Sequence, residues 1–174
     1  LLHPFTWRAK GVSVVSTRLQ RRYGGVLVRH GPDEKVFDPA RPELTNPLKC
    51  RQKLGLPLDR RLALFAGIPR PHKDLGMLVA ALGRAECADW SLVLVGPSDD
   101  PEFAAAASTL GSRCHRLGFQ PHTRLPAILA AVDAVPVPQR RTRFAESQVP
   151  AKLLDAMAMA KPVLASRVGE LPSI

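Results

Sequence analysis

The sequence predicts an α/β protein with a Rossmann-like parallel sheet covered by helices on both faces. Short apolar segments alternate with segments of helical spacing from residue 62 to residue 165. The apolar segments are continuous, as is typical of strands buried on both faces of a parallel sheet. The 174 residues, 45% of them hydrophobic, are enough for one domain of ordinary size with a substantial core, or one domain plus a piece of another.

The expected elements follow one another in a regular order, with glycine or proline at many of their ends. The expected strands are residues 11–16, 26–29, 62–66, 91–95, 114–119, 134–137 and 163–165. The expected helices are residues 17–23, 48–54, 75–82, 101–110, 123–131 and a last helix that starts with Pro150 and ends before Pro162. Residues 38–47 hold three prolines and no apolar period, so we expect a surface loop there.

The segment 147–166 predicts a loop, a helix, a tight connection and a buried strand. Val149 is a poor capping residue, so the first amides of the helix lack an obvious side-chain partner. Lys152 and Asp155 are three residues apart and share one helix face. Taken alone, this segment is either a buried helix with one exposed ion pair or an anion site at a helix N-terminus.

The charge of the chain favours an anionic partner. The formal net charge is +10 and the pI is near 10.4, which suits nucleic acid, a membrane surface or a phosphorylated small molecule. Aromatic residues make up only 5% of the chain and are not interleaved with the basic ones, which argues against stacking on single-stranded nucleic acid. The three cysteines show neither zinc spacing nor a disulfide framework, so a reducing cytosol is the expected location.

The loops that follow the predicted strands are rich in glycine and positive charge. Gly67 is followed by Arg70 and Lys73 near the start of a helix, an arrangement that suits a diphosphate or else forms a stiff loop with solvated charges. Residues 96–100 and 118–122 follow the next two strands, and the basic residues 138–146 follow the fourth. Because parallel strands end at one edge, we expect these loops to converge at the topological switch point.

Several enzyme signatures are absent from the sequence. No strand is followed by Gly-x-Gly-x-x-Gly, and neither a P-loop nor a Gly-x-Ser-x-Gly elbow is found. The five histidines lack metal-binding spacing, so we expect no metal site. His30 and His72 are interpreted as turn and loop residues.

Four motifs, in order and at matching intervals, resemble the donor-binding domain of family 4 glycosyltransferases (glycosyl transferases group 1), which have the GT-B fold. The segment 30–39 resembles the family's Asn-Gly-Val-Asp…Phe-x-Pro, and 67–73 resembles its glycine–arginine–lysine loop. The segment 117–133 resembles its Gly-Phe…Asp stretch, and 147–163 resembles its Glu-x₇-Glu-Ala-Met-Ala-x-Gly-Lys-Pro-Val. The resemblance covers nearly the whole chain.

This resemblance implies a retaining glycosyltransferase that moves a sugar from a nucleotide-diphosphate sugar to an acceptor. It implies a catalytic set and a set that binds the nucleotide-sugar. The implied catalytic residues are Lys73, Arg70 and Glu146, and the implied binding residues are Gly67, Gly96, Phe119, Ser147, Lys152, Leu154 and Asp155. Lys73 would hold the diphosphate, the backbone of Phe119 would lie by the base, and Asp155 would accept from the ribose hydroxyls. No cofactor or metal is required if lysine, arginine and helix amides stabilise the departing diphosphate.

The sequence departs from the family pattern at several positions. Ile68 stands where the family usually has arginine, with Arg70 as the nearby replacement. The first glutamate of the pair falls at Ser147, next to Glu146, and the second is Asp155. Ala160 replaces the usual glycine before Lys-Pro. A subset of the family has Ser-x-x-Pro-x-Lys at this place, which the segment 147–152 matches.

The resemblance also implies a division of the chain. Residues 1–24 would be the tail of an N-terminal acceptor-side domain, and residues 25–174 a donor-side domain that lacks its last strand and helix. The expected partners are the donor and a carbohydrate, lipid-linked or small-molecule acceptor, with peripheral contact to anionic lipid at the inner membrane face. A nucleic-acid-binding protein would need a basic face on a helix or sheet, whereas the motif cations lie in strand-end loops, so no nucleic acid is expected. The alternatives are a degenerate nucleotide-sugar-binding domain and another GT-B enzyme, such as a sugar-nucleotide epimerase.

Overall fold

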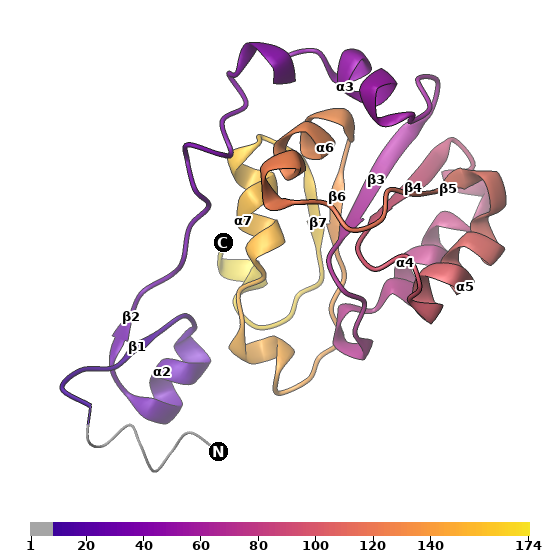
Figure 1. Ribbon diagram of the computed structural model, residues 1–174. Coiled ribbons are helices and arrows are strands. Elements are labelled where there is room, and N and C mark those ends of the chain that lie inside the picture. The colour runs from indigo at the N-terminus through magenta and orange to yellow at the C-terminus, as the bar shows by residue number, and fades with distance from the viewer. Residues whose placement is uncertain (1–8) are drawn as a thin grey trace.

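The main body of the protein is a parallel β-sheet between two layers of helices (Figure 1). The computed structural model describes residues 9–174. The strands of the main body are β3 (Arg61–Ala66), β4 (Trp90–Val95), β5 (Cys114–Arg116), β6 (Val135–Val137) and β7 (Val163–Ala165). The predicted α/β class with a Rossmann-like sheet is therefore confirmed.

The order of the strands places a switch point in the middle of the sheet. β3 pairs with β4, and β4 with β5, while β6 pairs with β7, all in parallel. Ala63 forms a parallel bridge with Ala134, and the Leu64 amide donates to the Ala134 carbonyl at 3.0 Å, which joins β3 to β6. The order is thus β5-β4-β3-β6-β7. Successive strands are added on one side of β3 up to β5 and on its other side from β6 onward, so the switch point lies between β3 and β6. A crevice is expected at the carboxyl ends of these two strands.

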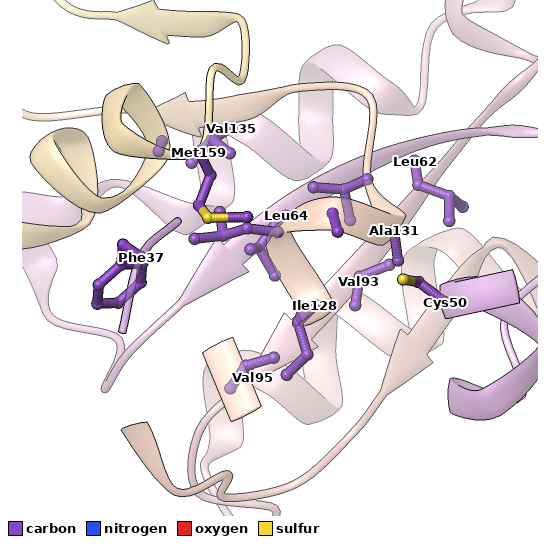
Figure 2. Close-up of a cluster of buried hydrophobic side chains, with 14 of the residues drawn as sticks. Phe37, Cys50, Leu62, Leu64, Val93, Val95, Ile128, Ala131, Val135 and Met159 are labelled. Atoms are coloured by element: carbon purple, nitrogen blue, oxygen red, sulfur yellow. The ribbon is translucent and has the colours of Figure 1, made fainter. Parts of the chain in front are cut away.

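Alternate residues of β3 serve the cores on the two faces of the sheet. Leu62 and Leu64 belong to the core against α3 (Pro47–Leu54), α6 (Leu125–Ala131) and α7 (Ala151–Ala158), as Figure 2 shows for part of it. Ala63 and Phe65 belong to the core against α4 (Leu75–Leu82) and α5 (Pro101–Leu110). Burial on both faces explains why the strand is apolar at every position from Leu62 to Ala66 rather than at alternate ones.

A small unit at the start of the described chain lies beside the main body (Figure 1). It comprises β1 (Ser13–Val14), α2 (Thr17–Tyr23) and β2 (Val26–Leu27), and its two strands pair in parallel. The Ser16 hydroxyl caps α2 by accepting from the Leu19 amide at 3.3 Å. β2 pairs with β1 across the division expected between residues 24 and 25. Residues 1–8 of the expected acceptor-side tail lie outside the described residues.

The two ends of α7 are capped in different ways. Pro150 is the N-cap rather than the first helical residue, and no side chain caps this end. The C-terminus is a Schellman motif, in which the Lys161 amide donates to the Ala156 carbonyl and the Ala160 amide to the Met157 carbonyl, each at 2.9 Å. Ala160 therefore has a φ of 51°, a left-handed conformation that glycine adopts more readily.

Several expected element boundaries are wrong for local reasons. β7 is not buried, because it pairs only with β6 among residues 9–174, and Leu164 is 63% exposed. β5 ends at Arg116 rather than at residue 119, since Gly118 turns the chain with a φ of 69°. α6 begins at Leu125, after a 3₁₀ turn over His122–Arg124, so that Pro126 falls in its first turn, where it is tolerated. Strands β1 and β2 are both shorter than expected.

Candidate functional site

Lys73 lies at the mouth of the switch point, directly after β3. Gly67 ends that strand with a φ of 110°, and a 3₁₀ turn over Pro71–Lys73 brings the lysine back toward it. The Lys73 ammonium donates to the Ile68 carbonyl at 2.7 Å and lies 3.5 Å from where a Cβ on residue 67 would be. A side chain at residue 67 would therefore not exclude the lysine, and glycine is favoured there because a φ of 110° is strained for other residues.

The glycine loops after β3, β4 and β5 meet at the same edge. The Gly96 amide donates to the Gly118 carbonyl at 3.1 Å. A Cβ on Gly96 would lie 2.7 Å from the Gly67 carbonyl oxygen, which is closer than real Cβ atoms approach, and 3.0 Å from the Phe103 ring, which is a tight contact. The predicted convergence of these three loops is therefore confirmed.

Lys152 is held in the first turn of α7, on the other side of the crevice. Its ammonium lies 4.3 Å from the centroid of the Phe65 ring, in position for a cation–π interaction. Burial, and secondarily the positive charge of Lys73, lowers the pKa of Lys152 to about 7. This lysine therefore changes its charge near neutral pH instead of being permanently positive.

The positively charged groups around this crevice lower one another's pKa values, in addition to the effect of burial. Burial and then the charge of Arg70 lower the pKa of Lys73. Burial and then the charges of Lys73, Lys152 and Arg70 lower the pKa of His72. The uncapped amides of α7 and the positive end of its dipole add to the same field. An anion placed between Lys73 and Lys152 would remove this repulsion, so the arrangement is chemically suited to bind one.

Asp155 lies one turn further along α7, and burial raises the pKa of its carboxyl against the opposing charges of His122 and His30. It forms no ion pair with Lys152, although the two residues share a helix face. The alternative of a helix with one exposed ion pair is therefore wrong. Asp155 remains available to accept hydrogen bonds.

Two cavities of about 330 Å³ each adjoin at Lys152 and Ala66. The first cavity lies between the ends of β3 and β6 and the start of α7, and the second lies among the three glycine loops. The other residues that line the first cavity include His30, Lys73, Gln139, Gln148 and Ala151. Those that line the second include Gly67, Gly96, Phe119, His122 and Asp155. A ligand that occupies both cavities would pass over Lys152.

Of the ten sequence-predicted site residues, six line these cavities. They are Lys73, Gly67, Gly96, Phe119, Lys152 and Asp155. Phe119 is 78% exposed and presents its ring at the edge of the second cavity. Arg70 is exposed and lines neither cavity, and it acts on the site through its charge on Lys73 and His72. Leu154 is half-buried on α7 and lines neither cavity.

Glu146 and Ser147 lie on the other side of the loop that precedes α7. Glu146 accepts from Arg18 of α2 at 2.8 Å, and the Ser147 hydroxyl donates to the Arg143 carbonyl at 2.7 Å. The basic residues of this loop also point away from the cavities. Arg140 pairs with Asp74 at 2.9 Å, and Arg141 donates to the Arg167 carbonyl at 3.2 Å. The expected basic mouth is therefore built from Lys73 and Lys152 and not from residues 140–143.

Several other residues that line the first cavity were not among the predicted site residues. His30, interpreted as a turn residue, lines it, as do Gln139 and Gln148. The Gln139 side chain is buried, and its Oε1 has no hydrogen-bond partner among residues 9–174. No motif marks either glutamine. The position of His30 in the segment that resembles the domain crossing was the one available signal.

Residues 9–174 lack two features, a membrane-spanning helix and a cluster of metal-ligating side chains. No helix there has both the length and the apolar character needed to cross a membrane. The same part of the chain has no cluster of three or more His, Cys, Asp or Glu side chains arranged to hold a metal ion.

Known proteins resemble this chain in both sequence and structure. A D-inositol 3-phosphate glycosyltransferase from Xylanimonas cellulosilytica is 33% identical over 95% of this chain and 43% of its own length. Sucrose-phosphate synthase from Thermosynechococcus elongatus superimposes with a TM-score of 0.70 and 27% identity, over 94% of this chain and 42% of that protein. The Anabaena protein HepE, solved with UDP and glucose, superimposes with a TM-score of 0.67 and 22% identity, over 95% and 46%.

This chain spans less than half the length of each of these three proteins. The family described as glycosyl transferases group 1 matches residues 60–174, which include β3 to β7 and, apart from His30, the residues that line the two cavities. The chain therefore belongs to the glycosyl transferases group 1 family.

Proposed function

We propose that the switch-point crevice binds a nucleotide-diphosphate sugar, the donor of a glycosyl transfer. The observation that supports this most is the pair of lysines, Lys73 and Lys152, that face one another across the crevice beside the uncapped N-terminus of α7. Each has a pKa that its surroundings lower in the absence of an anion. A diphosphate carries the negative charge that two neighbouring lysines are suited to bind.

The two cavities suggest how the donor lies. The nucleoside belongs in the second cavity, where Phe119 offers an exposed ring and backbone and Asp155 offers an acceptor for the ribose hydroxyls. The diphosphate lies at Lys152, where the cavities adjoin. The sugar belongs in the first cavity, among His30, Gln139 and Gln148, whose polar atoms suit sugar hydroxyls.

In this proposal the chain stabilises the leaving group. When the bond between the sugar and the diphosphate breaks, negative charge grows on the phosphate oxygens. Lys73, Lys152 and the first amides of α7 are fixed donors for that charge, and such groups contribute about 3–4 kcal/mol each in comparable sites. Arg70 would add a longer-range contribution. We infer that no metal is needed and that the configuration of the sugar is retained through an oxocarbenium-like transition state, as in family 4 enzymes.

The finer identity of the partners is also a proposal. The relative named D-inositol 3-phosphate glycosyltransferase supports a small, phosphorylated acceptor, and sucrose-phosphate synthase supports a sugar phosphate. A carbohydrate or lipid-linked acceptor is compatible with the same donor site. We propose a cytoplasmic location with contact to the inner membrane face through the arginines around α2, and no nucleic acid as partner. The complete protein would have an acceptor-side domain before residue 25.

A second candidate is a donor-binding domain without turnover. It is favoured by Ser147, which stands where the family has its first glutamate, and by the pairing of the neighbouring Glu146 with Arg18 rather than with groups at the cavities. This candidate predicts donor binding but no transfer by a protein that has both domains. A sugar-nucleotide epimerase would instead convert the donor without any acceptor.

A thermal-shift panel tests the proposed ligand class. Nucleoside diphosphates and their sugar conjugates are expected to raise the melting temperature in proportion to the logarithm of their concentration over Kd, while the matching nucleosides are not. The base and sugar that give the largest shift identify the donor. Equal shifts from nucleoside and nucleoside diphosphate would contradict the proposal, because the lysines would then contribute nothing.

A further inference from the structure

A larger cavity, of about 1030 Å³, lies between α2, the loop before α7 and the loop after β7. We call it the arginine groove. Its lining includes six arginines and two glutamates. They are Arg18, Arg21, Arg22, Arg141, Arg143 and Arg167, with Glu146 and Glu170. So dense a set of one charge along a concave surface produces a strong positive potential.

The two glutamates of the groove are already neutralised. Glu146 is paired with Arg18 at 2.8 Å. Glu170 is buried, with its side chain 5% exposed, and accepts from Arg29 at 2.9 Å and from the Thr17 amide at 3.0 Å. Their carboxylates are therefore not available to the remaining arginines.

The unpaired cations of the groove come from three separate segments. Arg21 belongs to α2, Arg143 to the loop before α7 and Arg167 to the loop after β7. None of the three has a carboxylate within 4.0 Å in the part of the chain that the structure describes. If these arginines served to form ion pairs within the protein, at least one of them would have a carboxylate beside it. Guanidinium groups that converge from different segments are suited to bind phosphate with several hydrogen bonds.

The walls of the groove are held in place by contacts distant in sequence. The Ser16 hydroxyl donates to the Ser147 carbonyl at 2.9 Å, across 131 positions of the chain. The hydrogen bonds of Thr17 and Arg29 to Glu170 fix the same unit to the far side of the groove. The arginines are thus presented on a preorganised surface, which lowers the entropic cost of binding.

The groove adjoins the donor cavities through one short segment. Ser147 lines the groove, and the next residue, Gln148, lines the first donor cavity together with Val149 and Pro150. A ligand in the groove would therefore sit across this segment from the place proposed for the sugar. This is where a molecule that receives the sugar would need to lie.

We propose that the arginine groove binds the phosphate group of a phosphorylated acceptor. The proposal rests on the proposed function, because it assigns to the groove the second substrate of the same transfer. The phosphate can belong to a soluble phosphomonoester or to a lipid headgroup, since both present the same group to the guanidiniums.

The test uses one phosphomonoester in two forms, with a matched pair of variants. Binding of the 174-residue chain to glycerol 3-phosphate is measured by calorimetry, and to phosphatidic acid vesicles in phosphatidylcholine by co-sedimentation. The groove variant is Arg143→Gln with Arg167→Gln. The control is Arg41→Gln with Arg84→Gln, which removes the same charge from two surface pairs with Glu43 and Glu86. UDP binding is measured in all three proteins.

We expect the groove variant to bind the phosphomonoester at least tenfold more weakly and the control less than twofold more weakly, with UDP affinity unchanged in both. Binding of the soluble form assigns a soluble acceptor, and binding of the vesicles alone assigns a lipid-borne one. Absence of binding to both forms, or equal weakening in the two variants, would overturn the groove as a site. If the unmodified chain does not bind UDP, that result would instead contradict the proposed function.

Discussion

At the scale of single residues, Lys152 is the side chain on which the donor site depends most. It lies where the two cavities adjoin, next to the Phe65 ring, and the charge of Lys73 adds to burial in lowering its pKa. The family pattern has arginine where this chain has Ile68, so the loop after β3 supplies one cation fewer at that position. Lys152 restores a second cation to the crevice from a different element.

The charge of Lys152 predicts a pH-dependent affinity. Its pKa of about 7 in the free chain must rise when a diphosphate binds, so binding takes up a proton above neutral pH. We expect the affinity for UDP to fall as pH rises from 7 to 9, by up to about tenfold per unit. Lys152→Gln should bind weakly without this fall, and Lys53→Gln, on the exposed face of α3, should behave as the unmodified chain.

Calorimetry in buffers of different ionisation enthalpy measures the proton uptake directly. A proton count near zero at pH 8 in the unmodified chain would show that Lys152 does not take up a proton on binding.

The lowered pKa of Lys152 also makes the stability of the fold depend on pH. Because the unfolded chain binds this proton more tightly, the contribution of Lys152 to folding becomes less unfavourable as pH rises from about 7 toward 10.5.

At the scale of elements, the sequence predicts best where local signals are strong. The helices at 17–23, 75–82 and 101–110 have the expected bounds, since capping residues and glycines mark their ends. Six of the ten predicted site residues line the cavities, because they follow parallel strands or begin α7. The positions of Glu146 and Ser147 were not predictable in this way. They depend on the packing of α2, which is some 130 residues away in the sequence.

The C-terminus of α7 shows an effect of a single departure from the family pattern. Ala160 occupies the left-handed position of the Schellman motif, where the family has glycine. We expect Ala160→Gly to raise the free energy of unfolding by about 1 kcal/mol, because it relieves the strain at a φ of 51°. Ala158→Gly, within the right-handed part of the same helix, should lower it by about 0.5–1 kcal/mol.

Urea denaturation of the two variants measures both changes. Destabilisation by Ala160→Gly would mean that residue 160 does not adopt the left-handed conformation. Changes of equal sign in both variants would mean that glycine acts through the unfolded chain alone.

At the scale of the whole molecule, Glu170 joins the α2 unit to the main body. Its buried carboxylate accepts from Arg29 and from both the amide and the hydroxyl of Thr17. These contacts form one wall of the arginine groove, so the groove exists only while the two parts are joined. The net charge of +10 is thus partly gathered around two adjacent cavities, one with lysines and one with arginines in its lining.

Removal of Glu170 should loosen the α2 unit without unfolding the sheet. We expect the amides of residues 13–28 to exchange with deuterium at least tenfold faster in Glu170→Ala, while β3 and β4 keep their protection. Glu43→Ala, which removes an exposed partner of Arg41, should change neither. Hydrogen exchange followed by mass spectrometry separates these cases. Uniform acceleration over the whole chain would contradict a local role for Glu170.

The measurement that tests the central claim most directly is calorimetry of UDP with the unmodified chain, Lys73→Ala and Lys49→Ala. Lys49 is an exposed lysine of α3, so it controls for loss of one positive charge. Loss of a charge-assisted hydrogen bond of about 1.5–3 kcal/mol predicts an affinity roughly 10 to 150 times lower in Lys73→Ala. Lys49→Ala should match the unmodified chain. Equal affinity in all three proteins would contradict a diphosphate site at the switch point.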